Sequence, residues 1–97
     1  MYAVIFRAKV GEQDSKYFST AEHMRQFAID EYGCKEFVAV TEGDDEIAIS
    51  YWESQDQIKS WRKNAEHIEA QEHGKESWYK SYSVQVVEVI REYSSQS

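Results

Sequence analysis

Several residue types are scarce in this sequence, and each absence excludes a class of protein. Proline is absent and only 4 glycines interrupt the 97 residues, so we expect helices and strands joined by short turns. Cys34 is the single cysteine, which excludes an intrachain disulfide and a cysteine-pair metal site and favours a cytoplasmic location. No apolar run approaches the roughly 20 residues that cross a bilayer. No signal peptide is expected ahead of the first strand.

Basic residues are also in the minority. The 18 acidic and 11 basic residues give a formal charge of −7, which repels phosphate backbones and anionic lipid. We therefore expect neither nucleic acid nor a membrane surface as a partner. The residues that are present, 41% hydrophobic and 14% aromatic, are typical of a globular chain. The length predicts one domain over residues 1–97, with 94–97 as a frayed polar tail.

Hydrophobic periodicity predicts four strands and two main helices. Gly33 is expected to end the first helix, and Ser54 with Gln57 forms a capping box at the start of the second. Turn residues at 42–45 join the two middle strands in a hairpin. The predicted strands cover residues 2–10, 37–41, 47–52 and 82–93, and the predicted helices cover 13–32 and 55–73, with a short helical piece at 75–80.

The element order βαββαβ predicts an α+β fold, a ferredoxin-like sandwich in which two helices cover one face of an antiparallel four-stranded sheet. The other face should be polar if it meets water, but apolar residues occupy both faces. On the second strand, Phe37 and Ala39 alternate with Val38 and Val40. Because two helices cover only one face, we expect a homodimer that pairs through the open sheet face. A monomer with an exposed apolar face is the alternative.

The second half of the chain resembles a known family. Residues 48–79 contain a strand ending in Tyr-Trp-Glu-Ser, a helix with a central Trp61, the run Asn-Ala-Glu-His and then Trp-Tyr, and residues 82–93 read YSVQVVEVIREY. These segments resemble the antibiotic biosynthesis monooxygenase (ABM) family. The resemblance implies a protomer whose sheet pairs with its twin in a dimeric α+β barrel. It also implies a choice of functions, since the family includes cofactor-independent monooxygenases of aromatic compounds, quinol oxygenases and haem-degrading enzymes.

The second predicted helix carries the candidate catalytic residues. A strip of uncharged polar residues lies beside its core stripe. The strip consists of Gln57, Ser60, Asn64, His67 and Gln71. Such a strip can line a half-buried pocket, with His67 as the proton acceptor and Asn64 as the group that stabilises an anion. Ser60, Gln71 and Trp61 would then contact the substrate. The alternative is a helix shoulder near a dimer seam, with ordinary structural hydrogen bonds.

Two residues outside this helix are further candidates for substrate binding. Arg7, on the first strand, could stabilise an anion, and Tyr51, on the third, could hydrogen-bond a phenolic oxygen. Surface charge and packing are the ordinary roles of these residue types. No metal site is expected, because the three histidines have no ligand-like spacing to acidic residues or to cysteine.

The resemblance also allows a test for haem chemistry. The haem-degrading branch uses a histidine ten residues after the helix tryptophan and an asparagine on the first strand. Here that helix position is Gln71, and residues 2–10 contain no asparagine, so haem degradation and a bound cofactor are not expected. The expected function is cofactor-independent oxidation of a small aromatic or quinol-like compound with O2. A dimer that binds a small ligand such as haem without turnover, and a ligand-free structural dimer, are the alternatives.

Overall fold

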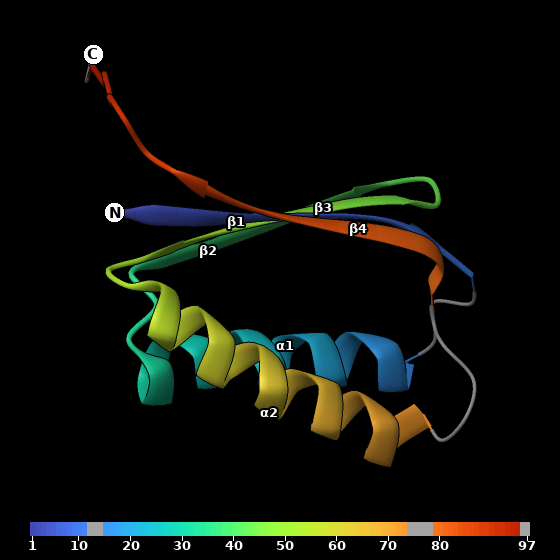
Figure 1. Cartoon of the computed structure of the whole chain (residues 1–97). Coiled ribbons are helices and arrows are strands. Elements are labelled where there is room, and N and C mark those ends of the chain that lie inside the picture. Colours follow the sequence, from blue (N-terminus) through green and yellow to red (C-terminus); the bar gives the residue numbers. More distant parts are fainter. Residues whose placement is uncertain (12–14, 74–78, 96–97) are drawn as a thin grey trace.

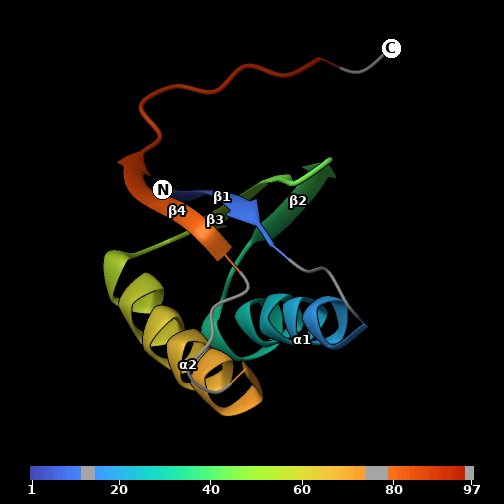
Figure 2. The ribbon, with the colours of Figure 1, turned by 90° about the vertical axis from the view of Figure 1, so that its right-hand side faces the viewer.

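Two layers make up the fold, a four-stranded sheet and a pair of helices on one of its faces (Figure 1). The computed structural model describes residues 1–11, 15–73 and 79–95, without the side chains of residue 16 and residues 66–73. Seen after a 90° turn, both helices still lie on the same side of the sheet (Figure 2). The element order is βαββαβ, so the predicted ferredoxin-like α+β sandwich is confirmed.

The sheet pairs its strands antiparallel in the order β2-β3-β1-β4. The strands are β1 (Tyr2–Val10), β2 (Glu36–Glu42), β3 (Asp45–Trp52) and β4 (Tyr79–Glu88). The hairpin between β2 and β3 turns at Gly43, whose φ of +61° is readily adopted by glycine. β1 and β3 occupy the centre, and alternate residues of each strand face the helices.

The first helix, α1 (Ser15–Tyr32), ends at Gly33. Gly33 has a φ of +78°, the left-handed conformation that commonly terminates a helix. The amide of Cys34 then donates to the carbonyl of Ala28 at 2.9 Å, which satisfies one of the acceptors left open at the helix end. Gly33 therefore turns the chain from α1 directly toward β2.

The second helix, α2 (Gln55–His73), begins with the predicted capping box. The amide of Gln57 donates to the Ser54 hydroxyl at 3.3 Å, and the amide of Ser54 donates to the side-chain carbonyl of Gln57 at 3.2 Å. Two amides that the helix leaves without a backbone acceptor are thus satisfied reciprocally. Because this cap sets the first residue of α2, it also sets which later side chains face α1.

Trp52 lies fully buried at the centre of the core between the helices and the sheet. Its indole nitrogen donates to the Ser50 hydroxyl at 2.8 Å, so the polar N–H group is satisfied inside the core. Val4, Ala28 and Ile58 belong to the same buried cluster, and they come from β1, α1 and α2. Truncating a tryptophan in such a setting costs about 3–5 kcal/mol. Trp52 is therefore a main anchor of both helices on the sheet.

The opposite face of the sheet carries neither helix and keeps large apolar side chains exposed. Val38 and Val40 of β2 are 46% and 60% exposed, and Ile47 of β3 is 37% exposed. Val38 pairs with Ile49 and Val40 with Ile47, so these side chains lie on one face. The prediction that both faces of the sheet are apolar is confirmed.

β4 ends earlier than the sequence predicted. The strand stops at Glu88, and residues 89–95 form no strand. Glu88 pairs with Tyr2, and the Val89 amide donates to the Met1 carbonyl at 3.0 Å. The described residues after Val89 form no further backbone pairing with β1. The prediction of a strand through residue 93 is wrong because apolar side chains do not supply the neighbouring backbone groups that a strand needs.

The start of β4 differs as well. Tyr79 and Lys80 belong to the strand, where a short helical piece over residues 75–80 was expected; residues 75–78 lie outside the described residues. Tyr79 pairs with Val10 and packs its ring at 5.1 Å from that of Phe6. This pairing with β1 overrides the local helical preference.

Candidate functional site

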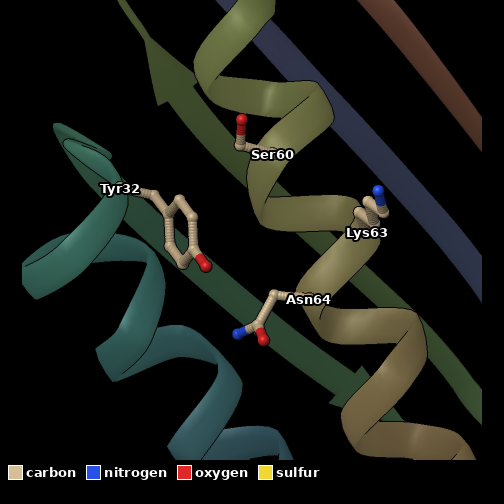
Figure 3. Close-up of a pocket in the computed structure, with 4 residues that line it drawn as sticks. All are labelled: Tyr32, Ser60, Lys63 and Asn64. Atoms are coloured by element: carbon tan, nitrogen blue, oxygen red, sulfur yellow. The ribbon is translucent and has the colours of Figure 1, made fainter.

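An open pocket lies between the two helices. Its described lining consists of Tyr32 from α1 and Ser60, Lys63 and Asn64 from α2, and its volume is about 430 Å³ (Figure 3). That volume falls within the range of about 300–1,000 Å³ typical of small-molecule sites. Figure 3 shows the Tyr32 ring and the Asn64 side chain extending toward one another across the gap. Both residues are half-buried, whereas Ser60 and Lys63 are exposed, so Tyr32 and Asn64 lie deeper and the other two form the rim.

Local geometry explains why these four residues meet. Ser60, Lys63 and Asn64 are separated by three and four positions, so they share one side of α2. Tyr32 is the last residue of α1. A Cβ atom on the following residue, Gly33, would lie only 2.6 Å from the side-chain nitrogen of Gln57 in the first turn of α2. The missing Cβ therefore lets the first turn of α2 pack closely against the end of α1, which places Tyr32 opposite Asn64.

The described lining includes two of the residues that the sequence singled out. Ser60 and Asn64 were placed together on the polar strip of the second helix, and they do line one pocket. Tyr32 was missed because it fits the apolar periodicity of α1, and Lys63 was missed because it fits the solvated face of α2. The available signal was the position of a tyrosine directly before a helix-ending glycine. Its use would have required knowing where α1 crosses α2, which is a tertiary property.

Trp61 is half-buried and is not among the described lining residues. Its ring lies 5.5 Å from that of Trp52 and 5.9 Å from that of Phe37, and its indole nitrogen donates to the Met24 carbonyl of α1 at 3.1 Å. Trp61 thus joins α2 to both α1 and the core. This role positions the neighbouring residue Ser60 at the pocket rim.

His67 and Gln71 follow Asn64 on α2, three and seven residues later. Their side chains lie outside the described residues. α2 runs as one helix through His73, so its backbone carries both positions along the same side as Asn64. The roles of His67 as base and Gln71 as a substrate contact stay predictions.

Tyr51 and Arg7 lie on the other side of the sheet. Tyr51 pairs with Ala3, and Arg7 pairs with Ile47, which belongs to the open face. Val4 and Trp52, the neighbours of Ala3 and Tyr51 in sequence, point to the helices. Within one chain, the structure therefore separates Tyr51 and Arg7 from the pocket between α1 and α2.

The described lining provides hydrogen-bond donors of several kinds. Tyr32 and Ser60 carry hydroxyl groups, Asn64 carries an amide, and Lys63 carries an ammonium group. Such groups can orient a ligand and stabilise negative charge on it. No group of three His, Cys, Asp or Glu side chains among the described residues could hold a metal ion.

Two buried groups outside the pocket are held in their neutral forms. Burial, together with the nearby carboxylate of Glu46, raises the pKa of the Tyr17 hydroxyl. Burial also raises the pKa of the Cys34 thiol, which donates to the Glu36 carbonyl at 3.2 Å. A thiol protected in this way is a poor nucleophile. Cys34 therefore acts as a small core residue.

The comparisons with known proteins agree with this architecture. No protein-family model matches the chain. The Bacillus subtilis protein YqjZ, described as uncharacterized, is 44% identical over 92 residues, which span 94% of this chain and 81% of YqjZ.

Neither helix, in the part of the chain that the structure describes, has the length and apolar character needed to cross a membrane.

Two solved structures share the fold at low sequence identity. The cofactor-independent oxygenase SnoaB from Streptomyces nogalater, solved as a point variant, superposes with a TM-score of 0.74 at 10% identity over 94% of each chain. The haem degrader MhuD from Mycobacterium tuberculosis, solved with two haems in its active site, superposes with a TM-score of 0.64 at 15% identity over 97% of this chain and 100% of MhuD. The chain therefore belongs to the family of YqjZ, and its fold is the one found in structures of antibiotic biosynthesis monooxygenases.

Proposed function

We propose that this protein is a cofactor-independent monooxygenase that oxidises a small aromatic or quinol-like compound with O2. The observation that carries the proposal is the pocket in which Tyr32 of α1 and Asn64 of α2 face each other. Asn64 precedes His67 on α2 by three residues, about one helical turn. The same fold supports oxygenation without a cofactor in SnoaB and haem degradation in MhuD. Oxidative chemistry on this scaffold is therefore a reasonable expectation, while the site has to supply the specificity.

The proposed reaction starts with removal of a proton from the substrate. His67 is the proposed base, because imidazole is the side chain whose ordinary pKa lies closest to neutral pH. Asn64 and Tyr32 donate hydrogen bonds to the substrate oxygen on which the negative charge collects. The anion is electron-rich enough to reduce O2 directly. With an anthrone, the ring CH2 becomes a carbonyl: one oxygen atom enters the product, and the other leaves as water with the two hydrogens.

Oxygen uptake tests this proposal. The protein is assayed with a panel of hydroxyanthrones and hydroquinones in the presence of a metal chelator. For His67→Ala we expect kcat to fall by about 10²–10⁴-fold, the range for loss of a general base. For Asn64→Ala we expect a fall of about 10²–10³-fold, as for loss of an anion-stabilising donor.

A histidine on the first helix provides the matched control. His23 of α1 is exposed and stacks on Phe27 at a ring distance of 4.7 Å, outside the described lining of the pocket. His23→Ala should therefore keep the wild-type rate. Equal rates for the wild type and His67→Ala would remove His67 from the mechanism. No uptake with any compound of the panel would refute the oxygenase function.

A dimer that binds a small ligand such as haem without turnover is the second candidate. The similarity to MhuD, whose structure holds two haems, favours it. Gln71 stands ten residues after Trp61, and a glutamine is not an ordinary haem ligand. A haem titration followed at the Soret band separates the candidates. An unchanged band excludes this second candidate for haem, and a shift that is lost in His67→Ala supports it.

We also propose that two copies of the chain pair through the open sheet face. The support is the exposed apolar surface formed by Val38, Val40 and Ile47, because contiguous apolar patches of this kind on small proteins usually mark interfaces. A twin subunit would bring its own Tyr51 and Arg7 to that seam.

The single free thiol of Cys34 supports a reducing, cytoplasmic location.

A further inference from the structure

We infer that the pocket between α1 and α2 selects an aromatic ligand that carries a negative charge, and that Lys63 is the residue that reads this charge. This inference rests on the proposed function, which makes the pocket the substrate-binding site. It adds the chemical class of the substrate. Lys63 has no role in the proposed mechanism, whereas Tyr32 donates a hydrogen bond to the substrate anion. Both belong to the described lining.

The composition of the lining is the first step. Its four described side chains offer a phenol hydroxyl, an aliphatic hydroxyl, a carboxamide and an ammonium group, and no carboxylate is among them. A cationic ligand would meet no opposite charge on this described surface. An anionic ligand would meet the donors of Tyr32 and Asn64 in the pocket. Lys63 belongs to the same lining, and rotation about its long side chain would bring its ammonium group from the solvent side of α2 to the rim.

The described pocket lining differs in charge from the molecule as a whole. At −7, the molecule as a whole repels anions. Charges farther away than about 8–10 Å are largely screened at physiological ionic strength, so the groups that touch the ligand decide its preferred charge. The acidic residue that precedes Lys63 on α2 is Asp56, seven residues and about two turns earlier, which is exposed and absent from the described lining. Among the residues that the structure describes, Lys63 forms no ion pair.

The aromatic part of the ligand is suggested by the ring of Tyr32 in the pocket lining. Tyr32 is half-buried and packs against the hydrophobic cluster around Trp52, so its ring offers an apolar surface as well as a hydroxyl. The ring of a ligand could lie against Tyr32 while its anionic group reaches the rim. The volume of about 430 Å³ accommodates a bicyclic or tricyclic compound.

Binding under nitrogen tests the inference without turnover. The probes are 3-hydroxy-2-naphthoate and its methyl ester, which differ mainly in the charge of one group, titrated calorimetrically at neutral pH. We expect the wild type to bind the acid about tenfold more tightly than the ester, the factor supplied by one charge-assisted hydrogen bond. Lys63→Gln should reduce this ratio to about one.

Two further variants make the result specific. Lys59→Gln removes the same charge from an exposed position one turn earlier on α2, outside the described lining, and should keep the tenfold ratio. Tyr32→Phe keeps the packing of the ring but removes a donor, and should weaken binding of the acid several-fold. Equal binding of acid and ester by the wild type would overturn the inference, as would failure to bind either or a preference that survives Lys63→Gln.

The proposed function and this inference can fail separately. Selective binding of the acid with no oxygen uptake would support the inference and refute the oxygenase. Oxygen uptake with uncharged substrates and no preference for the acid would support the oxygenase and refute the inference.

Discussion

The hydroxyl group of Tyr17 lies between α1 and the sheet in a residue that is only 2% exposed. Its ring packs edge-on against that of Tyr79 at 6.2 Å, and the carboxylate of Glu46 is nearby. Ionising the phenol there would place a negative charge in a desolvated site beside another acid. The pKa of Tyr17 therefore lies above its ordinary value of 10.0.

This shift predicts a loss of stability at alkaline pH. Above about pH 10 the unfolded chain releases the Tyr17 proton while the native chain holds it, so the free energy of unfolding falls by about 1.4 kcal/mol per pH unit. Tyr17→Phe should lack this component, and Tyr93→Phe, at a position that is 83% exposed, should retain it. Urea unfolding at neutral pH and near pH 11 checks the prediction. Equal alkaline losses in wild type and Tyr17→Phe would contradict it.

At the scale of elements, the connection from α1 to α2 sets the geometry of the pocket. The side-chain carbonyl oxygen of Gln57 accepts from the backbone amides of Glu53 and Ser54, both at 3.2 Å. The side-chain nitrogen of the same residue lies against Gly33 at the end of α1. One side chain thus starts α2 and contacts the end of α1.

Gln57→Ala should therefore destabilise the protein by about 1 kcal/mol, as for loss of a helix cap, and lower Tm by about 4–8 °C for a domain of this size. Gln26→Ala is the matched control. Gln26 of α1 is in an exposed i,i+4 pair with Asp30 at 3.0 Å, which is worth only a few tenths of a kcal/mol. Thermal unfolding followed by circular dichroism measures the Tm of both variants. Equal decreases in Tm for Gln57→Ala and Gln26→Ala would contradict the stabilising role of the Gln57 cap.

The elements themselves were predictable from the sequence because local patterns determine them. The strand-forming residues at 37–41 and 47–52 and the turn residues at 42–45 predict the β2–β3 hairpin, and the capping box predicts the first residue of α2. The C-terminal end of β4 was not predictable, since it depends on pairing with β1, which is far away in the sequence. Tyr32 was not predicted for a similar reason, because the crossing of α1 and α2 brings it to Asn64. Lys63 was not predicted because it fits the solvated face of α2.

At the scale of the whole molecule, a thin two-layer structure leaves one sheet face without a cover (Figure 1). Only an additional layer would bury the apolar side chains of Val38, Val40 and Ile47, and a second copy of the same face provides a self-complementary layer. A sheet exposed in this way would otherwise be an aggregation hazard. The proposed dimer follows from this surface and not from the pocket.

Val40→Lys should weaken the proposed dimer, because it places a charge within the exposed apolar surface of the open sheet face, and we expect at least a tenfold rise in the dissociation constant. Phe18→Lys is the control: Phe18 is 54% exposed on α1, in the helical layer, so its substitution should leave the dimer intact. Sedimentation equilibrium distinguishes the 11.4 kDa chain from a species of twice that mass. A wild type that sediments as a single chain would contradict the dimer.

Isotope labelling with ¹⁸O2 tests the central claim most directly, namely that the pocket beside His67 oxygenates an aromatic compound without a cofactor. The compound of the anthrone panel that gives the fastest oxygen uptake is incubated with chelator-treated protein, and the product is analysed by mass spectrometry. We predict one ¹⁸O atom per product molecule in the wild type, and loss of enzymatic product in His67→Ala. A product without ¹⁸O, or turnover that requires added flavin or metal, would contradict the account.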